Sequence, residues 1–173
     1  MEKEYKFIGY EYKEVAVNRD MESLWADCYG SFGWILEGKS SPLPGKNTVN
    51  LKFKRDRKIR NKMELTRLQR QFEGSVKQIE NLENSKYTAA LIFAIGVGIL
   101  GTAFMALAVF SYLKGRIFLH IVFAIPAFLG WILPYFGYRK IVSKKADKIN
   151  PIIEEVYDKI YDTCEKASRL TEK

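Results

Sequence analysis

The sequence has little of what catalytic, metal-binding and secreted proteins depend on. Its 173 residues contain one histidine, His120, and two cysteines, Cys28 and Cys164. The cysteines lie far apart in the chain and have no His or Cys neighbour at the spacing of metal ligands, which argues against a disulfide framework and against a zinc site. We expect both to be small buried hydrophobic residues in a reducing compartment.

Familiar catalytic motifs are also missing. The sequence has no glycine-rich phosphate loop, no GxSxG and no HExxH. No acidic residue or cysteine lies close to His120 in sequence that could form a catalytic pair with it. We therefore predict that the chain is not an enzyme and that it holds no cofactor and no metal.

The N-terminal residues MEKEYK lack the basic start and the apolar run of a secretory signal. We therefore expect the N-terminus to stay in the cytosol.

Charge is absent from two long stretches in the middle of the chain. No charged residue lies between Lys86 and Lys114, and none lies between Arg116 and Arg139. Each stretch is long enough for a helix that crosses a hydrocarbon core of ~30 Å, which takes ~20 residues. Two such runs in succession are very unusual for a soluble protein of this size. The sequence predicts transmembrane helices at 88–113 and 117–138, joined by an outer turn at 114–116.

The distribution of lysine and arginine predicts the orientation of this hairpin. The turn carries only Lys114 and Arg116, whereas the opposite side carries more basic residues close to the spans. Because basic residues favour the cytoplasmic side, we predict a multi-pass inner-membrane protein with both termini in the cytoplasm. The basic residues on that side are Lys77, Lys86, Arg139, Lys140, Lys144, Lys145 and Lys148.

Small residues recur along the first span and predict close helix packing. They fall mainly at every fourth position and allow another helix to approach closely in lipid. Two partners fit equally well: the second span of the same chain, or a second copy in a homo-oligomer. The residues are Ala90, Ala94, Gly98, Gly101, Thr102 and Ala106.

The spans contain no Asp, Glu, Lys or Arg, and His120 is their only imidazole. A polar residue inside a membrane is a candidate functional site, although His120 lies close enough to the outer end to reach the headgroups. The missing carboxylates argue against a proton relay and against a carboxylate-lined cation filter. A pore with backbone or apolar walls in an oligomer stays open as an alternative.

The first 56 residues predict a small α+β domain of order βαββ. Aromatic and β-branched residues from Tyr5 to Val17 predict a strand, 21–29 a helix, and 32–36 and 48–54 two further strands. In the last strand Val49, Leu51 and Phe53 alternate with polar residues and should face inward. Apolar stripes then predict a stalk helix at 57–87 and a helical tail at 139–173 with a coiled-coil-like seam.

Short motifs in this N-terminal third resemble a small bacterial domain family of unknown function. Its members read YEYK, a short helix, GWEL and a closing FKR strand. The matching residues here are Tyr10-Glu11-Tyr12-Lys13, then Gly33-Trp34-Ile35-Leu36 in place of GWEL, then Phe53-Lys54-Arg55. The resemblance implies a fold and a bacterial origin but no activity.

The net charge of +8 concentrates in a basic patch after the last predicted strand. It could be a solvated surface, or it could bind anionic lipid or an acidic protein partner. No recognisable module supports nucleic-acid binding. The residues of this patch are Lys52, Lys54, Arg55, Arg57, Lys58, Arg60 and Lys62.

Together these patterns predict a mostly α membrane protein: a two-helix transmembrane hairpin, long cytosolic helical extensions and a small N-terminal α+β domain. The leading hypothesis is an oligomeric bacterial inner-membrane scaffold, sensor or accessory subunit that presents a cytosolic binding domain. The alternative is a homo-oligomeric channel formed by the hairpin.

Overall fold

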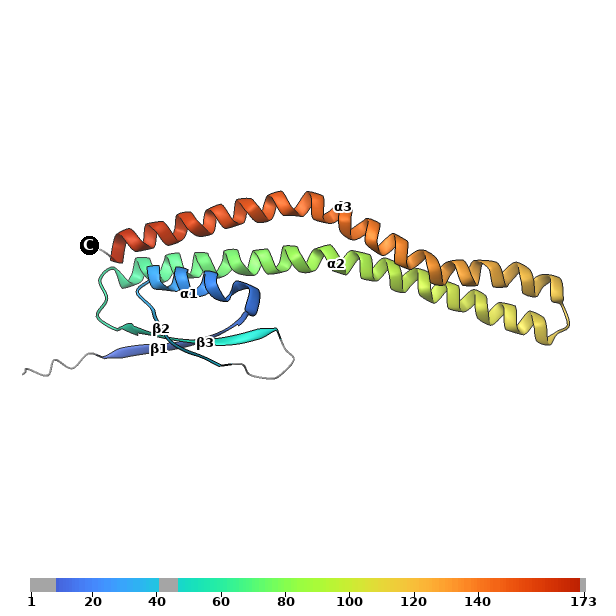
Figure 1. The fold of residues 1–173 in the computed structure, drawn as a ribbon, viewed down its shortest axis with the longest axis horizontal. Coiled ribbons are helices and arrows are strands. Elements are labelled where there is room, and N and C mark those ends of the chain that lie inside the picture. Colours follow the sequence, from blue (N-terminus) through green and yellow to red (C-terminus); the bar gives the residue numbers. More distant parts are fainter. Residues whose placement is uncertain (1–8, 41–46, 172–173) are drawn as a thin grey trace, which may run out of the picture. The chain divides into compact units, whose positions relative to one another are not determined.

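The computed structural model describes residues 9–40 and 47–171 (Figure 1). The fold is mostly helical (76%), with one three-stranded sheet and two long apolar helices, which confirms the predicted fold class at that level. The chain forms two compact units. Residues 1–77 and 156–173 form the α+β unit, and residues 78–155 form the hairpin unit.

The sheet of the α+β unit is antiparallel, in the order β1-β3-β2. Its strands are β1 (Tyr10–Asn18), β2 (Ile35–Ser40) and β3 (Thr48–Asp56). The register sets Tyr12 opposite Lys54 and Val17 opposite Val49, and β2 joins β3 with a register shift between Leu36 and Gly38. The predicted strand residues from Tyr5 to Ile8, and the part of the loop at 41–46, lie outside the described residues.

The short helix α1 (Glu22–Ser31) of this unit follows a 3-10 turn, η1 (Arg19–Met21). Gly33 ends it with φ +80: the Trp34 N–H bonds the Tyr29 carbonyl at 3.1 Å and the Gly33 N–H bonds the Gly30 carbonyl at 3.0 Å. This is a Schellman motif, which places a left-handed glycine just after a helix. The motif uses residues 32–34, so β2 begins at Ile35 rather than at the predicted Phe32.

The core of the α+β unit centres on Tyr29, which is fully buried and whose ring centroid lies 4.6 Å from that of Phe53. The first turns of α2 (Lys62–Leu113) and the last turns of α3 (Ile117–Thr171) belong to this unit and contribute to its core. Apolar residues buried in the unit include Val17, Trp25, Phe32, Val49, Leu51, Leu65, Leu68, Phe72, Val76, Val156, Ile160 and Ala167.

Both long helices are continuous. α2 has 52 residues and joins the predicted stalk to the first predicted span without a break. α3 has 55 residues and contains Pro126, Pro134 and Pro151. Each proline removes one backbone donor, yet none of them ends the helix. α3 passes through Pro151 without a break, and the side-chain oxygen of the preceding Asn150 accepts a hydrogen bond from Lys86 of α2 at 2.8 Å.

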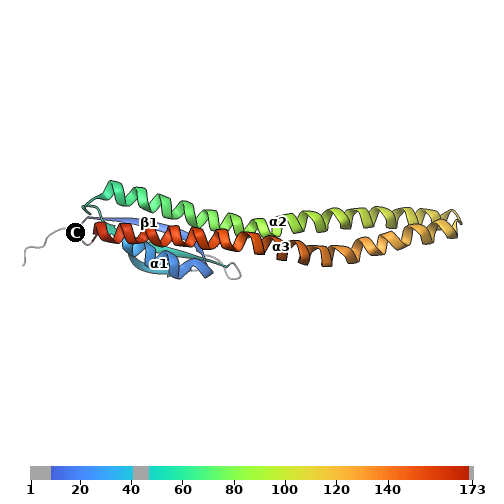
Figure 2. The ribbon, with the colours of Figure 1, turned by 90° about the horizontal axis from the view of Figure 1, so that it is seen from above.

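Within the hairpin unit, α2 and α3 run antiparallel and side by side (Figures 1 and 2). Their backbones meet at two glycines: a Cβ added to Gly130 would lie 2.7 Å from the Cα of Gly101. A turn at 114–116 joins them, with Gly115 at φ +70. By length and composition both helices could cross a membrane, and only 11% of the most apolar window in each is buried.

Candidate functional site

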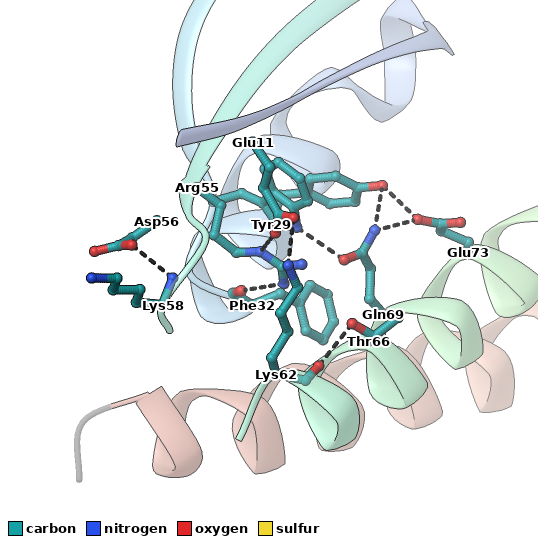
Figure 3. A network of polar contacts seen from close by, with 11 residues as sticks. Glu11, Tyr29, Phe32, Arg55, Asp56, Lys58, Lys62, Thr66, Gln69 and Glu73 are labelled. Atoms are coloured by element: carbon teal, nitrogen blue, oxygen red, sulfur yellow. Dashed lines mark hydrogen bonds and ion pairs between the residues drawn. The ribbon is translucent and has the colours of Figure 1, made fainter. Parts of the chain in front are cut away.

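A buried arginine holds one end of the α+β unit together (Figure 3). Arg55 is 3% exposed because it continues the inward-facing alternation of β3 beyond Phe53. Its Nε donates to Glu11 of β1 at 2.6 Å, its Nη1 donates to the Phe32 carbonyl at 3.2 Å, and its guanidinium lies 4.4 Å from the Trp34 ring. Arg55 therefore ties β3 to β1 and to the end of α1.

Lys62, at the start of α2, donates to the second carboxylate oxygen of Glu11 at 2.6 Å. A single acidic side chain thus compensates one buried and one half-buried cation. We call Glu11, Arg55 and Lys62 the arginine cluster.

A second polar chain lies beside it in the core and centres on Glu73 of α2. One carboxylate oxygen of Glu73 accepts hydrogen bonds from Lys13 and Tyr29, both at 2.6 Å, and from Gln69 at 2.8 Å. Gln69 in turn accepts from the indole N–H of Trp34 at 2.9 Å. Since Trp34 also stacks on Arg55, the two sets of contacts form one network that joins β1, β3, α1 and α2.

The network controls the ionisation of its members. Burial raises the pKa of Glu73, but the hydrogen bonds from Lys13, Tyr29 and Gln69 outweigh it and leave the pKa below its ordinary value. Glu11 behaves in the same way, because the bonds from Lys62 and Arg55 overcome burial and lower its pKa. Burial, and then the hydrogen bond to Glu73, raise the pKa of Tyr29, so the phenol stays a donor at neutral pH.

These shifts predict acid sensitivity of the α+β unit. The ordinary pKa of Glu11 and Glu73 is 4.5 and the folded state lowers both, so their stabilisation is complete above 4.5 and is lost as the pH falls through the depressed values. We expect the melting temperature of the full chain's α+β unit, followed by circular dichroism in detergent, to fall below pH 4.5.

A Glu11→Gln, Glu73→Gln double variant should melt at a lower temperature at pH 7 and should depend less on pH between 5 and 3. Glu14→Gln, at an exposed carboxylate of the same strand β1, is the matched control and should keep the wild-type profile. An unchanged pH profile in the double variant would contradict the role of the network.

The polar groups of the network are satisfied by one another. Among the residues that the structure describes, no buried side-chain nitrogen or oxygen lacks a hydrogen-bond partner. Over the same described residues, no group of three His, Cys, Asp or Glu side chains could hold a metal ion. The network can therefore fix the conformation of the unit.

The predicted basic patch is divided by the fold. Arg55 is buried, Lys62 is bound to Glu11, and Lys54 bonds Glu37 at 3.1 Å. The other predicted members, Lys52, Arg57, Lys58 and Arg60, are exposed. A different basic surface lies on the first turns of α2, where a groove of about 490 Å³ is lined by Lys62, Met63, Thr66, Arg67 and Arg70.

The predicted small-residue stripe does not stay on one face of α2. Ala90 and Gly101 are buried, Ala94 and Gly98 are half-buried, and Thr102 and Ala106 are exposed. On a helix of 3.6 residues per turn, residues four positions apart are rotated by about 40° from one to the next. The stripe therefore winds from the side of α2 that faces α3 to the side that faces away from α3, which we call the open side of α2. Gly101 meets α3, whereas a Cβ at Gly98 would meet nothing within 4 Å.

His120 lies near the turn and binds across the hairpin. Its Nδ1 is 2.9 Å from the carbonyl oxygen of Ala108, and its ring lies 5.5 Å from that of Tyr112. Because a carbonyl only accepts, Nδ1 carries the hydrogen in this contact. The side chain joins the two helices beside the turn at 114–116.

No family model, no curated protein and no solved structure matches the chain. The resemblance of the N-terminal third to a bacterial domain family therefore stays a prediction.

Two features of the structure have little signal in the sequence. Lys86 is only 7% exposed; its ammonium binds Glu83 at 2.9 Å and Asn150 of α3 at 2.8 Å. This polar contact joins α2 to α3 just before the first uncharged stretch begins.

The second feature is the contact between Cys28 and Cys164, which are 136 positions apart and whose thiols hydrogen-bond in the core. Sequence spacing gives no indication of either contact.

Proposed function

We propose that this chain is an integral protein of the bacterial inner membrane, anchored by residues 88–138 of α2 and α3, that presents the α+β unit in the cytoplasm as a scaffold, sensor or accessory subunit. The observation that carries the proposal is the exposure of large apolar side chains along both helices. Ile99 is 64% exposed and Phe136 is also 64% exposed. Water would strongly disfavour so much contiguous apolar surface, whereas lipid would solvate it.

The chemistry of the two units supports the same division. Backbone groups within a long helix are satisfied internally, as a bilayer requires, and the described part of the α+β unit carries many ion pairs that suit an aqueous surface. Basic residues follow the second apolar segment at Arg139, Lys140 and Lys144, which favours this end as the cytoplasmic one.

Membrane anchoring and topology can be tested together in the full chain. We expect the protein to stay in the membrane pellet after extraction with alkaline carbonate. A green fluorescent protein fused after Lys173 should fluoresce, and alkaline phosphatase inserted at Gly115 should be active outside the inner membrane. Release by carbonate would contradict anchoring, and a reversed pair of reporter signals would contradict the topology.

We further propose that the anchored chain forms a homo-oligomer through the open side of α2. Adding a Cβ at Gly96 or Gly98 would meet nothing within 4 Å, so these small residues leave room for a helix of another copy. Mass measurement in detergent tests this: a defined multiple of the 20.0 kDa chain is expected, and a strict monomer would overturn it.

The cytoplasmic partner should be acidic. The groove on α2 places Arg70 beside the side chain of Met63, which is 90% exposed. Lys62 and Arg67 also line it, although each is already paired within the chain, with Glu11 and Glu64. Anionic headgroups or acidic side chains would complement these cations, and the methionine would add an adaptable apolar contact. Copurification of an acidic protein with the full chain would indicate a protein partner. Retention of the chain's α+β unit on anionic vesicles would indicate lipid headgroups.

A further inference from the structure

Three contacts align the end of α3 with α1 in the α+β unit. The Tyr157 hydroxyl is 3.6 Å from the Met21 sulfur, the thiols of Cys164 and Cys28 hydrogen-bond, and the Thr171 hydroxyl donates to the Ser31 carbonyl at 2.9 Å. Figure 2 shows α1 beneath this end of α3. Residues 157, 164 and 171 are seven apart, so they lie on one face of the helix.

The spacing on both sides fixes the level of the two thiols. From Met21 to Cys28 and from Tyr157 to Cys164 the chain advances by the same seven residues in helical conformation. The two segments therefore run in the same direction, and the cysteines lie between a contact on one side, Tyr157 with Met21, and a contact on the other, Thr171 with Ser31. A disulfide requires two Cβ atoms that face each other at short range, and the flanking contacts hold the two cysteines beside each other.

We propose that Cys28 and Cys164 form a reversible disulfide that fastens the C-terminal end of α3 to α1. The cysteines are thus a modification site and not only packing residues. In the reduced state described here they are free thiols, 4% and 7% exposed.

The chemistry requires a two-electron oxidant, and a small hydroperoxide fits a nearly closed site. The Cys28 thiolate attacks the peroxide, the O–O bond breaks, and Cys28 becomes a sulfenic acid while the peroxide leaves as an alcohol. The Cys164 sulfur then attacks the sulfenic sulfur; the S–S bond forms, the S–O bond breaks, and the Cys164 proton leaves with the hydroxyl as water. The two thiols lose two electrons and the peroxide gains them. An external dithiol reverses the reaction by exchange.

The roles of the two sulfurs follow from their hydrogen bond. The bond from Cys164 lowers the pKa of Cys28 in spite of burial, and the same bond together with burial raises the pKa of Cys164. Since the thiolate is the nucleophile, the lowered pKa favours Cys28 as the sulfur that reacts first, and exchanging the two roles would give the same disulfide. Access comes from the helix end: Cys164 lies about two turns before Thr171, and helix ends open more readily than their centres.

Oxidation would change the stability of the α+β unit. The disulfide would close a loop that contains both apolar segments, and long closed loops restrict the unfolded chain most strongly. It would also prevent α3 from leaving α1, so the C-terminal end could respond to an oxidant by becoming fixed.

The full-length chain in detergent can be compared after treatment with dithiothreitol and after treatment with tert-butyl hydroperoxide. We expect the oxidised protein to lose both free thiols, to lose two hydrogen atoms in intact mass, and to yield one linked peptide that contains positions 28 and 164. Its melting temperature should rise by several degrees and should return after dithiothreitol. This readout needs only the wild-type chain.

Cys28→Ser and Cys164→Ser are the matched controls. Neither variant should form an intrachain link, and neither should be stabilised by peroxide. The proposal is overturned if the wild-type chain keeps both thiols, if it gains oxygen atoms as sulfinic acid, or if its only disulfide joins two separate chains.

Discussion

Replacing Arg55 by methionine should strongly destabilise the α+β unit and leave the helices of the hairpin unit in place. Methionine keeps an apolar stem of similar length but loses the guanidinium, so the bonds to Glu11 and Phe32 and the stacking on Trp34 disappear together. Removing one partner of a buried ion pair typically costs ~3–5 kcal/mol. Glu11 retains Lys62, so we expect about 3 kcal/mol, a large share of the ~5–15 kcal/mol that stabilises a typical domain.

Limited proteolysis of the full chain in detergent measures this effect, since a cut within the first 60 positions reports opening of the α+β unit. Lys54→Met is the matched control, because it makes the same kind of change at the preceding position of β3, where the side chain is half-buried and lies on the opposite face of the sheet. Arg55→Lys should rescue only in part, since an ammonium cannot reproduce the planar fork. Equal protease resistance of Arg55→Met and Lys54→Met would contradict the role of Arg55.

The position of Arg55 shows what the alternating pattern can and cannot predict. Alternation predicts that Val49, Leu51 and Phe53 face inward, and all three are buried. Two residues further the same period points inward again, but a charged residue in a basic run was assigned to the surface. The burial of Arg55 depends on Glu11, 44 positions earlier, and no local pattern indicates that such a partner is present.

The long helices show the same limit at a larger scale. The two uncharged stretches predict two long apolar helices with a turn at 114–116, and α2 and α3 end and begin at those positions. The contacts of the last turns of α3 with Met21 and with Ser31 of α1 could not be predicted in this way. An apolar stripe shows that one face of a helix is buried, but it does not identify the surface that covers it.

The small residues of the first apolar segment now divide into two groups with different expected effects. Gly101 and Gly130 bring the two backbones together, and a side chain at Gly130 would begin 2.7 Å from the Gly101 Cα and 3.1 Å from its nitrogen. Backbone atoms inside helices cannot move aside as a flexible side chain can. Gly130→Leu should therefore force α2 and α3 apart along the hairpin, and overpacking of this kind costs ~1–3 kcal/mol or more.

We expect Gly130→Leu to lower the thermal stability of the hairpin unit in detergent and to change the fluorescence of Trp131, which lies beside the glycine contact. Gly98→Leu introduces the same side chain where an added Cβ would meet nothing within 4 Å, so the hairpin should remain stable. If copies associate through the open side of α2, Gly98→Leu should instead reduce the mass of the assembly. Equal loss of hairpin stability in both variants would show that the contact between Gly101 and Gly130 has no special role. An assembly unaffected by Gly98→Leu would place the interface on another face of the hairpin.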